Sequence, residues 1–368
     1  MPRTGKAVIC RELNQPVVVE PISVDAPKRG EVMVKIAACG VCHSDLSATN
    51  GTIALPPPLV LGHEGAGEVV EVGEGVTGFA AGDHVVSSFI YMCGKCRFCA
   101  GARPVLCLEQ GKALTTPPEG TPRVKDAAGK PLGIFSGCGV MAEYATLSVD
   151  NLVKIDPQIP LDRAALVGCA VTTGVGAVFN TAKVEPGASV AVFGCGGVGL
   201  NVVQGAAIAG AGRIIAIDTL QEKLDLAKRF GATDAILARP GEDTAKALKK
   251  LTGGGPDYAF ECVGVGALAE TAYRAIRRGG KAVIVGVARP SDAAAIKPMT
   301  MVFEEKSLQG SYFGSSVPRI DFPRMLQLYR AGRLKLDELI THRYRIDEAP
   351  QAFADLVAGR NARGVIVF

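Results

Sequence analysis

The sequence predicts an α/β protein in which a doubly wound parallel sheet is inserted into a second, β-rich domain. Residues 189–312 alternate between apolar, strand-like runs and helix-like runs, whereas residues 6–88 consist of short strands bounded by Gly and Pro. The C-terminal residues end in one more strand-like run, GVIVF, which we expect to return to the first domain. The length of 368 residues fits this division, since a domain takes about 150 residues.

The expected domain limits follow from these patterns. Residues 1–170 and 313–368 form the first domain, which carries a Cys-rich lobe at 93–107, and residues 171–312 form the second. The segment from Leu161 to Thr181 is small and apolar, and we expect it to be a helix that leads from one domain into the next.

A glycine-rich turn lies inside the second domain, between the apolar strand SVAVF and a helix-like segment. It matches G-x-G-x-x-G and includes Gly194, Gly196, Gly197, Val198 and Gly199. One match is weak in a chain with 45 glycines, but the flanking strand and helix are the context that a dinucleotide-binding fingerprint requires. Its glycines allow a tight turn, a close approach to the pyrophosphate and close helix packing.

An acid ends the following strand at the expected distance. Asp218 lies 19 residues after Gly199, near the roughly 20-residue spacing of the acid that binds the adenosine ribose. A carboxylate there accepts hydrogen bonds from the ribose hydroxyls and repels a 2′-phosphate. The sequence therefore predicts NAD as the cofactor rather than NADP.

Composition narrows the function classes and the compartment. Forty basic and 36 acidic residues give a net charge of +4 without a basic run, so nothing favours binding to nucleic acid. No run approaches the roughly 20 apolar residues of a membrane span. The N-terminal residues lack the apolar block of a signal peptide, and we expect a cytoplasmic protein. Eleven cysteines then indicate metal ligands and buried thiols rather than disulfides.

Four of these cysteines are closely spaced. Cys93, Cys96, Cys99 and Cys107 form the pattern C-x2-C-x2-C-x7-C. Four thiolates can close around one Zn²⁺ ion, which is typical of a structural zinc site. The alternative is an iron–sulfur cluster, but the last spacing is too long for the bacterial ferredoxin pattern and no Pro follows it.

A second set of ligand types is dispersed: Cys42 in CGVCHSD, His63 in LGHEGAG and Cys169 in LVGCAVTTG. Two thiolates and one imidazole would leave a fourth position open, as in a catalytic zinc site. Spacing alone does not select these residues. Cys39 and Cys42 also form CxxC, but without the βαβ context of a thiol oxidoreductase, and we interpret Cys39 as a packing residue.

Together these motifs resemble the zinc-containing medium-chain alcohol dehydrogenases over the whole chain. The matching stretches are CGVCHSD, GHEGAGEVVEVGEGV, GDHVV, CGKCRFC, GCAVTTG, VFGCGGVGL, DELITH and ARGVIVF. The resemblance implies a GroES-like β-barrel catalytic domain interrupted by a Rossmann domain. It also implies NAD and two zinc ions per chain, and alcohol dehydrogenase is itself a common example of a Cys2His catalytic zinc site.

The resemblance assigns expected roles to single residues. Cys42, His63 and Cys169 would bind the catalytic zinc, with Asp45 orienting the histidine and Glu64 behind the metal. The four cysteines of the lobe would bind the structural zinc. Residues that would contact the cofactor are His43, Thr173, Lys223 and Arg363, and those that would line the substrate pocket are Ile53 and Phe89.

Ser44 matches the hydroxyl that takes the alcohol proton. Many relatives carry a histidine three residues later, where this chain has Ser47. A serine conducts a proton but does not hold one at neutral pH. We therefore expect the proton relay to end in water, or in His43 if its ring reaches.

The expected activity is reversible hydride transfer between a primary, apolar or aromatic alcohol and NAD. The first alternative is the glutathione-linked formaldehyde dehydrogenase subgroup, which uses a pocket acid and an arginine where this chain has Ile53 and Gly111, with Lys112 adjacent. A polyol dehydrogenase fits less well, because that group commonly has Glu at the position of Cys169. A non-catalytic zinc-stabilised or redox-sensing protein is the alternative of another class.

The resemblance also suggests the assembly. The segment between Cys107 and Glu143 is long, as in the dimeric members of the family, and the outer strand near Met301 to Tyr312 could pair across a two-fold axis. We expect a homodimer that acts on a small-molecule alcohol or aldehyde.

Overall fold

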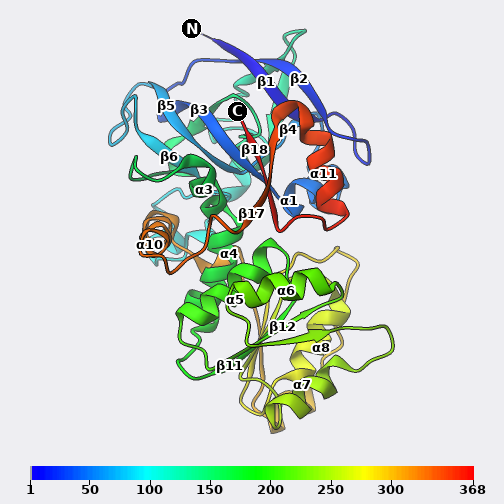
Figure 1. The fold of residues 1–368 in the computed structure, drawn as a ribbon. Helices are drawn as coiled ribbons and strands as arrows, with labels where there is room; N and C mark the ends of the chain where they lie inside the picture. The colour runs from blue at the N-terminus through cyan, green and yellow to red at the C-terminus, as the bar shows by residue number, and fades with distance from the viewer. Residues whose placement is uncertain (1) are drawn as a thin grey trace. The chain divides into compact units, whose positions relative to one another are not determined.

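The computed structural model describes residues 2–368 and divides into two compact units (Figure 1). The first contains the chain up to Cys169 together with Val317–Gln327 and Leu336–Phe368, and the second contains Ala170–Ser316 and Leu328–Lys335. The expected limits, 1–170 with 313–368 and 171–312, stay a prediction, and residues 328–335 group here with the second unit.

A closed barrel forms one part of the first unit. Its strands follow the order β1-β2-β7-β8-β4. They are β1 (Arg3–Cys10), β2 (Val18–Val24), β7 (Val124–Asp126), β8 (Pro131–Ile134) and β4 (Leu59–Val60). Ala7, Ile9, Ile22 and Val24 point into one buried cluster, as alternation along paired strands requires. The β-rich character expected for this unit is confirmed.

A seven-stranded sheet forms the other part of the first unit. Its strands are β3 (Glu31–Val41), β5 (Glu64–Val72), β6 (His84–Ser87), β9 (Tyr144–Ser148), β10 (Leu152–Lys154), β17 (Ile340–Arg345) and β18 (Arg363–Val367). β18 pairs antiparallel with β3, where Ile366 lies opposite Cys39. The C-terminal strand therefore returns to the first unit.

Further helices lie between the strands of the first unit and in the segments that lead into and out of the second sheet. The α-helices outside the second sheet are α1 (His43–Thr49), α2 (Arg97–Ala100), α3 (Leu161–Ala165), α4 (Ala170–Gly176), α10 (Pro318–Arg330) and α11 (Ala349–Val357). The 3-10 helices are η1 (Pro104–Leu106), η2 (Gln110–Ala113), η3 (Phe135–Gly137), η4 (Val149–Asn151), η5 (Leu166–Gly168), η7 (Phe313–Ser315) and η8 (Ile346–Glu348), and η6 (Ala177–Ala182) is a π-helix.

The helix expected from Leu161 to Thr181 is interrupted. Cys169 has φ −149° and ψ −73°, outside the helical region, so η5 ends before it and α4 begins after it. Gly168 makes this break possible, because a Cβ atom there would lie 2.8 Å from the Ser87 carbonyl oxygen. The backbone is thereby drawn against β6 and the Cys169 side chain leaves the helical register.

Among residues 2–368 we find no single helix that is long and apolar enough to cross a membrane. Residues 161–168 and 170–182 reach that length and composition only as a pair, which is bent by 55°.

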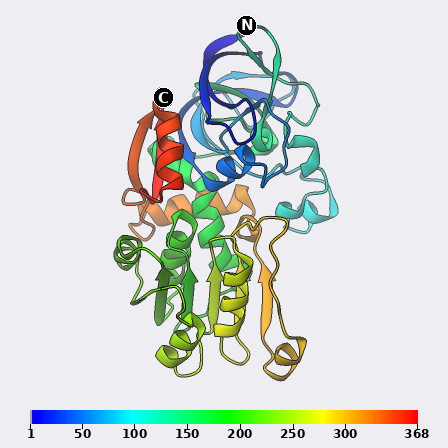
Figure 2. The ribbon, with the colours of Figure 1, turned by 90° about the vertical axis from the view of Figure 1, so that its right-hand side faces the viewer.

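The second unit contains a six-stranded parallel sheet with the order β13-β12-β11-β14-β15-β16 (Figure 2). The strands are β11 (Ser189–Phe193), β12 (Arg213–Asp218), β13 (Asp234–Leu237), β14 (Tyr258–Glu261), β15 (Lys281–Ile284) and β16 (Ser307–Gly310). The connecting helices are α5 (Gly197–Ile208), α6 (Gln221–Arg229), α7 (Thr244–Thr252), α8 (Gly266–Ala275) and α9 (Pro298–Phe303).

The strand order reverses between β11 and β14, which is the switch point of a doubly wound sheet. Val190, Ala191 and Val192 of β11 are fully buried, since helices cover both faces of such a sheet. The predicted fold class, a Rossmann sheet inserted into a GroES-like barrel domain, is confirmed.

Candidate metal and dinucleotide sites

Four buried ligand groups converge in the first unit. Cys42, His63, Glu64 and Cys169 each offer one ligand atom, and these atoms all lie within 4.8 Å of one another. Each residue stands at the end of an element: Cys42 precedes α1, Glu64 opens β5 directly after His63, and Cys169 follows η5. Residues that are 127 positions apart in the chain (42 to 169) are thus brought together.

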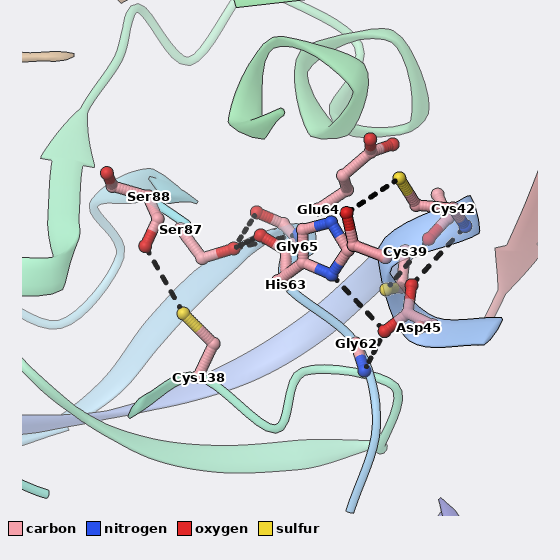
Figure 3. A network of polar contacts seen from close by, with 12 residues as sticks. Cys39, Cys42, Asp45, Gly62, His63, Glu64, Gly65, Ser87, Ser88 and Cys138 are labelled. Atoms are coloured by element: carbon pink, nitrogen blue, oxygen red, sulfur yellow. Dashed lines mark hydrogen bonds and ion pairs between the residues drawn. The ribbon is translucent and has the colours of Figure 1, made fainter. Parts of the chain in front are cut away.

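Asp45 fixes the orientation of the His63 ring (Figure 3). His63 Nδ1 lies 3.2 Å from Asp45 Oδ1, an oxygen that also accepts a 2.9 Å hydrogen bond from the Gly62 N–H. The other Asp45 oxygen accepts from the Cys42 N–H at 3.3 Å. One carboxylate therefore positions two of the converging residues, as carboxylates commonly do behind metal-binding histidines.

His63 is also held by two aromatic rings. Phe89 and Phe135 lie edge-on to the imidazole, with ring centroids 5.0 and 5.2 Å away. Phe89 was expected in the substrate pocket, whereas Phe135 was not expected here, because nothing in its local sequence indicates that it packs on residue 63. The ring is fully buried, and Nε2 has no partner of ordinary hydrogen-bond geometry among residues 2–368, although Cys42 lies beside it.

The backbone around these residues is close-packed. Ser87 Oγ donates to the His63 carbonyl at 2.9 Å and accepts from the Gly65 N–H at 2.8 Å. A Cβ atom at Gly40 would lie 2.1 Å from a Glu64 carboxylate oxygen. Gly40 therefore leaves the space that the Glu64 side chain occupies.

Cys42 and Cys169 shift each other's pKa in opposite directions. The hydrogen bond between the two thiols holds the pKa of Cys42 well below the ordinary value, and the same bond raises the pKa of Cys169. Burial lowers the pKa of His63, but Asp45 and Cys42 outweigh this effect and hold that pKa well above its usual range. Cys42 is therefore the first of the two thiols to ionise.

Glu64 forms a buried ion pair with Arg363 of β18. Burial raises the pKa of Glu64 to about 7, although the guanidinium acts in the opposite direction. Only 3% of Arg363 is exposed. The cofactor contact expected of Arg363 would thus require this pair to open.

The residues expected in the relay and the substrate pocket lie near α1. Ser44 Oγ is 3.8 Å from Cys42 Sγ, and Ser47 is half-buried with its carbonyl accepting from the Ile53 N–H at 2.9 Å. His43 is exposed. Ile53 packs, together with Phe89, against the apolar core of the first unit.

The Cys-rich lobe forms a second group of ligand atoms. Cys93, Cys96, Cys99 and Cys107 place their sulfurs within 4.8 Å of one another. Backbone N–H groups point at two of these sulfurs, from Cys96 to Cys93 at 3.4 Å and from Cys99 to Cys96 at 3.5 Å. Such bonds stabilise thiolates, and those from the backbone lower the pKa of Cys96 to about 6.

Both groups fit zinc. Four convergent sulfurs match a closed structural site. Two sulfurs and one imidazole, with a carboxylate behind them, match an open catalytic site, and the unpartnered His63 Nε2 is the atom that would bind the ion.

The glycine-rich turn lies in the second unit, after β11. Gly194 has φ +87°, and a Cβ atom at Gly199 would lie 1.8 Å from the Gly194 carbonyl oxygen, so both positions require glycine. A Cβ atom at Gly196 would meet nothing within 4 Å. The turn is therefore tight on its inner side and open where a pyrophosphate would approach the N-terminus of α5.

Asp218 ends β12 beside this turn. Its Oδ2 accepts from the Cys195 N–H at 2.8 Å, and its Oδ1 accepts from the N–H groups of Thr219 and Leu220 at 2.8 and 3.1 Å. Asp218 thus anchors the turn as well as presenting a carboxylate. Lys223 is half-buried in the first turn of α6, and Thr173 is half-buried in α4.

Family models match most of the chain. The alcohol dehydrogenase GroES-like domain matches residues 28–157, and the zinc-binding dehydrogenase domain matches residues 197–331. A curated relative from Synechocystis sp., S-(hydroxymethyl)glutathione dehydrogenase, is 42% identical over 372 residues, covering 98% of this chain and 99% of that protein.

Solved structures agree with this grouping. An alcohol dehydrogenase zinc-binding domain protein from Burkholderia ambifaria superposes with a TM-score of 0.96 at 35% identity, over all of both chains. Benzyl alcohol dehydrogenase from Acinetobacter calcoaceticus gives 0.94 at 31% identity, over 100% of this chain and 99% of that one. This chain therefore belongs to the zinc-containing medium-chain alcohol dehydrogenases and is an NAD- and zinc-dependent oxidoreductase.

Proposed function

We propose that the chain catalyses hydride transfer between the CH2OH group of a primary alcohol and NAD, with Cys42, His63 and Cys169 as ligands of the catalytic zinc. The observation that supports this proposal most directly is the buried convergence of these donors around the unpartnered His63 Nε2. The four cysteines of the lobe hold the second, structural zinc. When bound, zinc would withdraw electron density from the alcohol oxygen, and NAD would accept the hydride.

The chain's own residues have separate tasks in this mechanism. Asp45 keeps the imidazole turned toward the ligand group through its 3.2 Å contact with Nδ1. Ser44, which lies beside Cys42, accepts the alcohol proton and passes it toward the solvent. Ser47 cannot store that proton, so the relay ends in water or at the exposed His43.

The cofactor contacts follow from the second unit. We assign the pyrophosphate to the turn Gly194–Gly199, including Gly197 and Val198, and the adenosine ribose to Asp218. Thr173, Lys223, His43 and Arg363 keep their proposed roles as further cofactor contacts.

S-(hydroxymethyl)glutathione is the leading candidate substrate. Several curated relatives at 42% identity over nearly the whole chain carry the name S-(hydroxymethyl)glutathione dehydrogenase. These comparisons favour the glutathione-linked alternative over the apolar or aromatic alcohol that we expected from the sequence. The reaction is of the same type, because this adduct also presents a CH2OH group.

A benzyl-type alcohol is the second candidate, and specific residues favour it. Phe89 makes the surroundings of His63 apolar, Ile53 packs against the same apolar core, and the position expected to carry an arginine is Gly111. Lys112, the next residue in the sequence, is paired with Glu109. A charged tripeptide adduct would find neither the pocket acid nor the arginine in this chain.

Parallel assays with both substrates decide between them. We would measure zinc per chain and kcat/KM for S-(hydroxymethyl)glutathione and for benzyl alcohol. The leading candidate requires the adduct to be preferred, and a preference for benzyl alcohol would favour the second. If neither substrate reduced NAD in protein holding two zinc ions, the proposed activity would be wrong.

Two buried cysteines provide a matched pair for the ligand assignment. Cys42→Ala should lose one zinc and reduce kcat at least about 10²-fold, since a ligand change disturbs both metal affinity and position. Cys39→Ala should keep both zinc ions, because Cys39 lies outside the ligand group. Equal zinc content in the two variants would contradict the assignment.

We further propose a homodimer, which is supported by exposed apolar residues of α9 and by the edge strand β16 that follows this helix. The cytoplasmic location expected from the N-terminal sequence stays a prediction.

A further inference from the structure

A buried carboxylate at the end of β14 has no role in the mechanism above. Glu261 is fully buried in the second unit, at the strand that adjoins β11 across the switch point. Its Oε1 accepts hydrogen bonds of 2.8 Å from the N–H groups of both Val263 and Gly264. The turn that follows β14 is thus folded back onto the side chain of the strand's last residue.

This turn is also locked to the turn after β15. The Glu261 carbonyl accepts from the N–H groups of Val285 and Gly286 at 2.8 and 3.0 Å. Gly264 has φ +87°, and a Cβ atom there would lie 2.4 Å from the Val287 carbonyl oxygen. Glu261 therefore bonds to both turns through its side chain and its backbone.

The two turns present apolar side chains at the edge where the dinucleotide is proposed to bind. Val263, Val265 and Val287 are 50%, 38% and 62% exposed. One methyl of Val263 would lie 2.4 Å from a Cβ atom at Gly194, the first glycine of the phosphate turn. Val263 therefore lies beside the phosphate turn, on the side of that turn that faces β14.

The direction of the cofactor follows from the strand order. A dinucleotide crosses the carboxyl ends of the strands at the switch point, and Asp218 places the adenosine ribose at β12. The nicotinamide half then extends toward β14 and β15, where Val263 and Val287 lie.

We propose that Glu261 is a positioning residue that holds the Val263–Gly264 turn in place and so shapes the surface under the nicotinamide half of NAD. The proposal rests on the dinucleotide site proposed above. Glu261 touches neither cofactor nor substrate and acts through Val263. An apolar replacement would release two N–H groups and let the turn move.

The test compares the whole cofactor with ADP-ribose, which lacks only the nicotinamide ring. In the zinc-loaded enzyme, Glu261→Ala should weaken NADH about tenfold or more, because two hydrogen bonds are lost. ADP-ribose should weaken less than about threefold, since it lacks the nicotinamide. Both dissociation constants come from fluorescence and competition titrations. Loss of overall stability alone would leave the ratio of the two constants unchanged.

Further variants separate the role of the hydrogen bonds from that of burial. Glu261→Gln keeps an oxygen acceptor, and its ratio of the NADH to the ADP-ribose dissociation constant should stay near that of the parent. Val263→Ala removes apolar surface that the turn presents, and it should change the ratio of the NADH to the ADP-ribose dissociation constant in the same direction as Glu261→Ala, even if the latter does not fold. Glu185→Gln removes an exposed carboxylate at the opposite end of β11 and is the control.

Unchanged ratios in both Glu261→Ala and Val263→Ala would overturn the proposal, as would a Glu261→Gln ratio equal to that of Glu261→Ala. If Glu261→Ala does not fold, the Val263→Ala ratio alone decides. A parent enzyme that binds ADP-ribose but not NADH would instead count against the proposed function.

Discussion

At the level of single residues, local spacing and long-range packing differ in what they reveal. Cys93 to Cys107 could be identified from the sequence because four thiols fall within 15 residues (93 to 107). Cys42, His63 and Cys169 could be identified only through the family resemblance. Their convergence depends on Gly168 lying against Ser87, a contact between segments that are 81 residues apart (87 to 168) and that no local pattern encodes.

Asp218 illustrates a residue whose role was predicted only in part. The spacing from the glycine turn indicated the ribose contact, but not the 2.8 Å hydrogen bond from the Cys195 N–H. That bond exists because β11 and β12 are neighbours in the sheet. Replacement of Asp218 therefore has two effects, one on charge and one on the shape of the turn.

Two substitutions separate these effects. Asp218→Asn keeps a carbonyl oxygen for the Cys195 N–H, gives up the bonds from Thr219 and Leu220, and removes the charge. The ratio of kcat/KM for NADP to that for NAD should therefore rise about tenfold or more. Asp218→Ala should raise the same ratio but also weaken both cofactors, because the turn loses its anchor. Asp225→Asn, on the exposed face of α6, is the control. An unchanged ratio in Asp218→Asn would show that the carboxylate does not select NAD.

At the level of elements, periodicity predicted the parallel sheet well and the helix from Leu161 to Thr181 poorly. Apolar strands and helices alternate along residues 189–312, and each of these strands is part of the parallel sheet. Cys169 breaks the helix because of contacts with β5 and β6, which the apolar composition of the segment does not reveal. Phe135 was missed for the same reason.

A hydrogen-bonded carboxylate, Asp257, also links the start of β11 to the start of β14. Asp257 accepts 2.7 and 2.5 Å hydrogen bonds from the Ser189 N–H and hydroxyl, and one of 2.6 Å from Arg277 Nε. Burial acts to raise the pKa of Asp257, but these bonds outweigh it and hold the pKa below the ordinary value. The stabilisation is therefore complete above the unfolded-state pKa of about 3.9 and is lost as the pH falls through the folded-state pKa.

Asp257→Asn should lower the free energy of unfolding by about 1–3 kcal/mol at pH 7, because bonds to a charged acceptor become bonds to an amide. The gap between variant and parent should narrow below about pH 4, where the parent carboxylate also becomes neutral. Urea unfolding at pH 7 and below about pH 4 measures the difference in free energy of unfolding between variant and parent. Loss of zinc in acid affects both proteins alike and does not change this difference. Asp225→Asn serves as the exposed control. A difference in free energy of unfolding that stayed constant with pH would contradict the role assigned to the Asp257 carboxylate.

At the level of the whole molecule, the family and the cofactor class were predictable because many motifs carry them, whereas the substrate depends on a few pocket positions. Ile53 and Gly111 favoured an apolar alcohol, and whole-chain similarity favours S-(hydroxymethyl)glutathione. The pocket positions and the rest of the chain thus favour different substrates. Identity over the full chain averages the core with the pocket, and only the pocket selects between two CH2OH groups.

The assembly depends on surface rather than motif. β16 is an edge strand that, among the described residues, pairs only with β15, and the preceding α9 leaves Met299, Val302 and Phe303 at 66%, 72% and 78% exposure. Open strand edges and clustered exposed apolar side chains are typical of surfaces that a partner covers. A two-fold pairing of β16 with its own copy would satisfy both features at once.

Sedimentation velocity tests this arrangement. The parent should sediment as a dimer, and Val302→Glu should shift it toward monomer, because two carboxylates would enter one apolar interface of about 1,000 Å² or more. Ile320→Glu replaces an equally conspicuous side chain, 64% exposed on α10, and should leave the dimer intact. Zinc content should stay at two per chain in each variant, which separates dissociation from unfolding. A monomeric or tetrameric parent would rule out the dimer, and dissociation by Ile320→Glu with no effect of Val302→Glu would move the interface from α9 and β16 to the first unit.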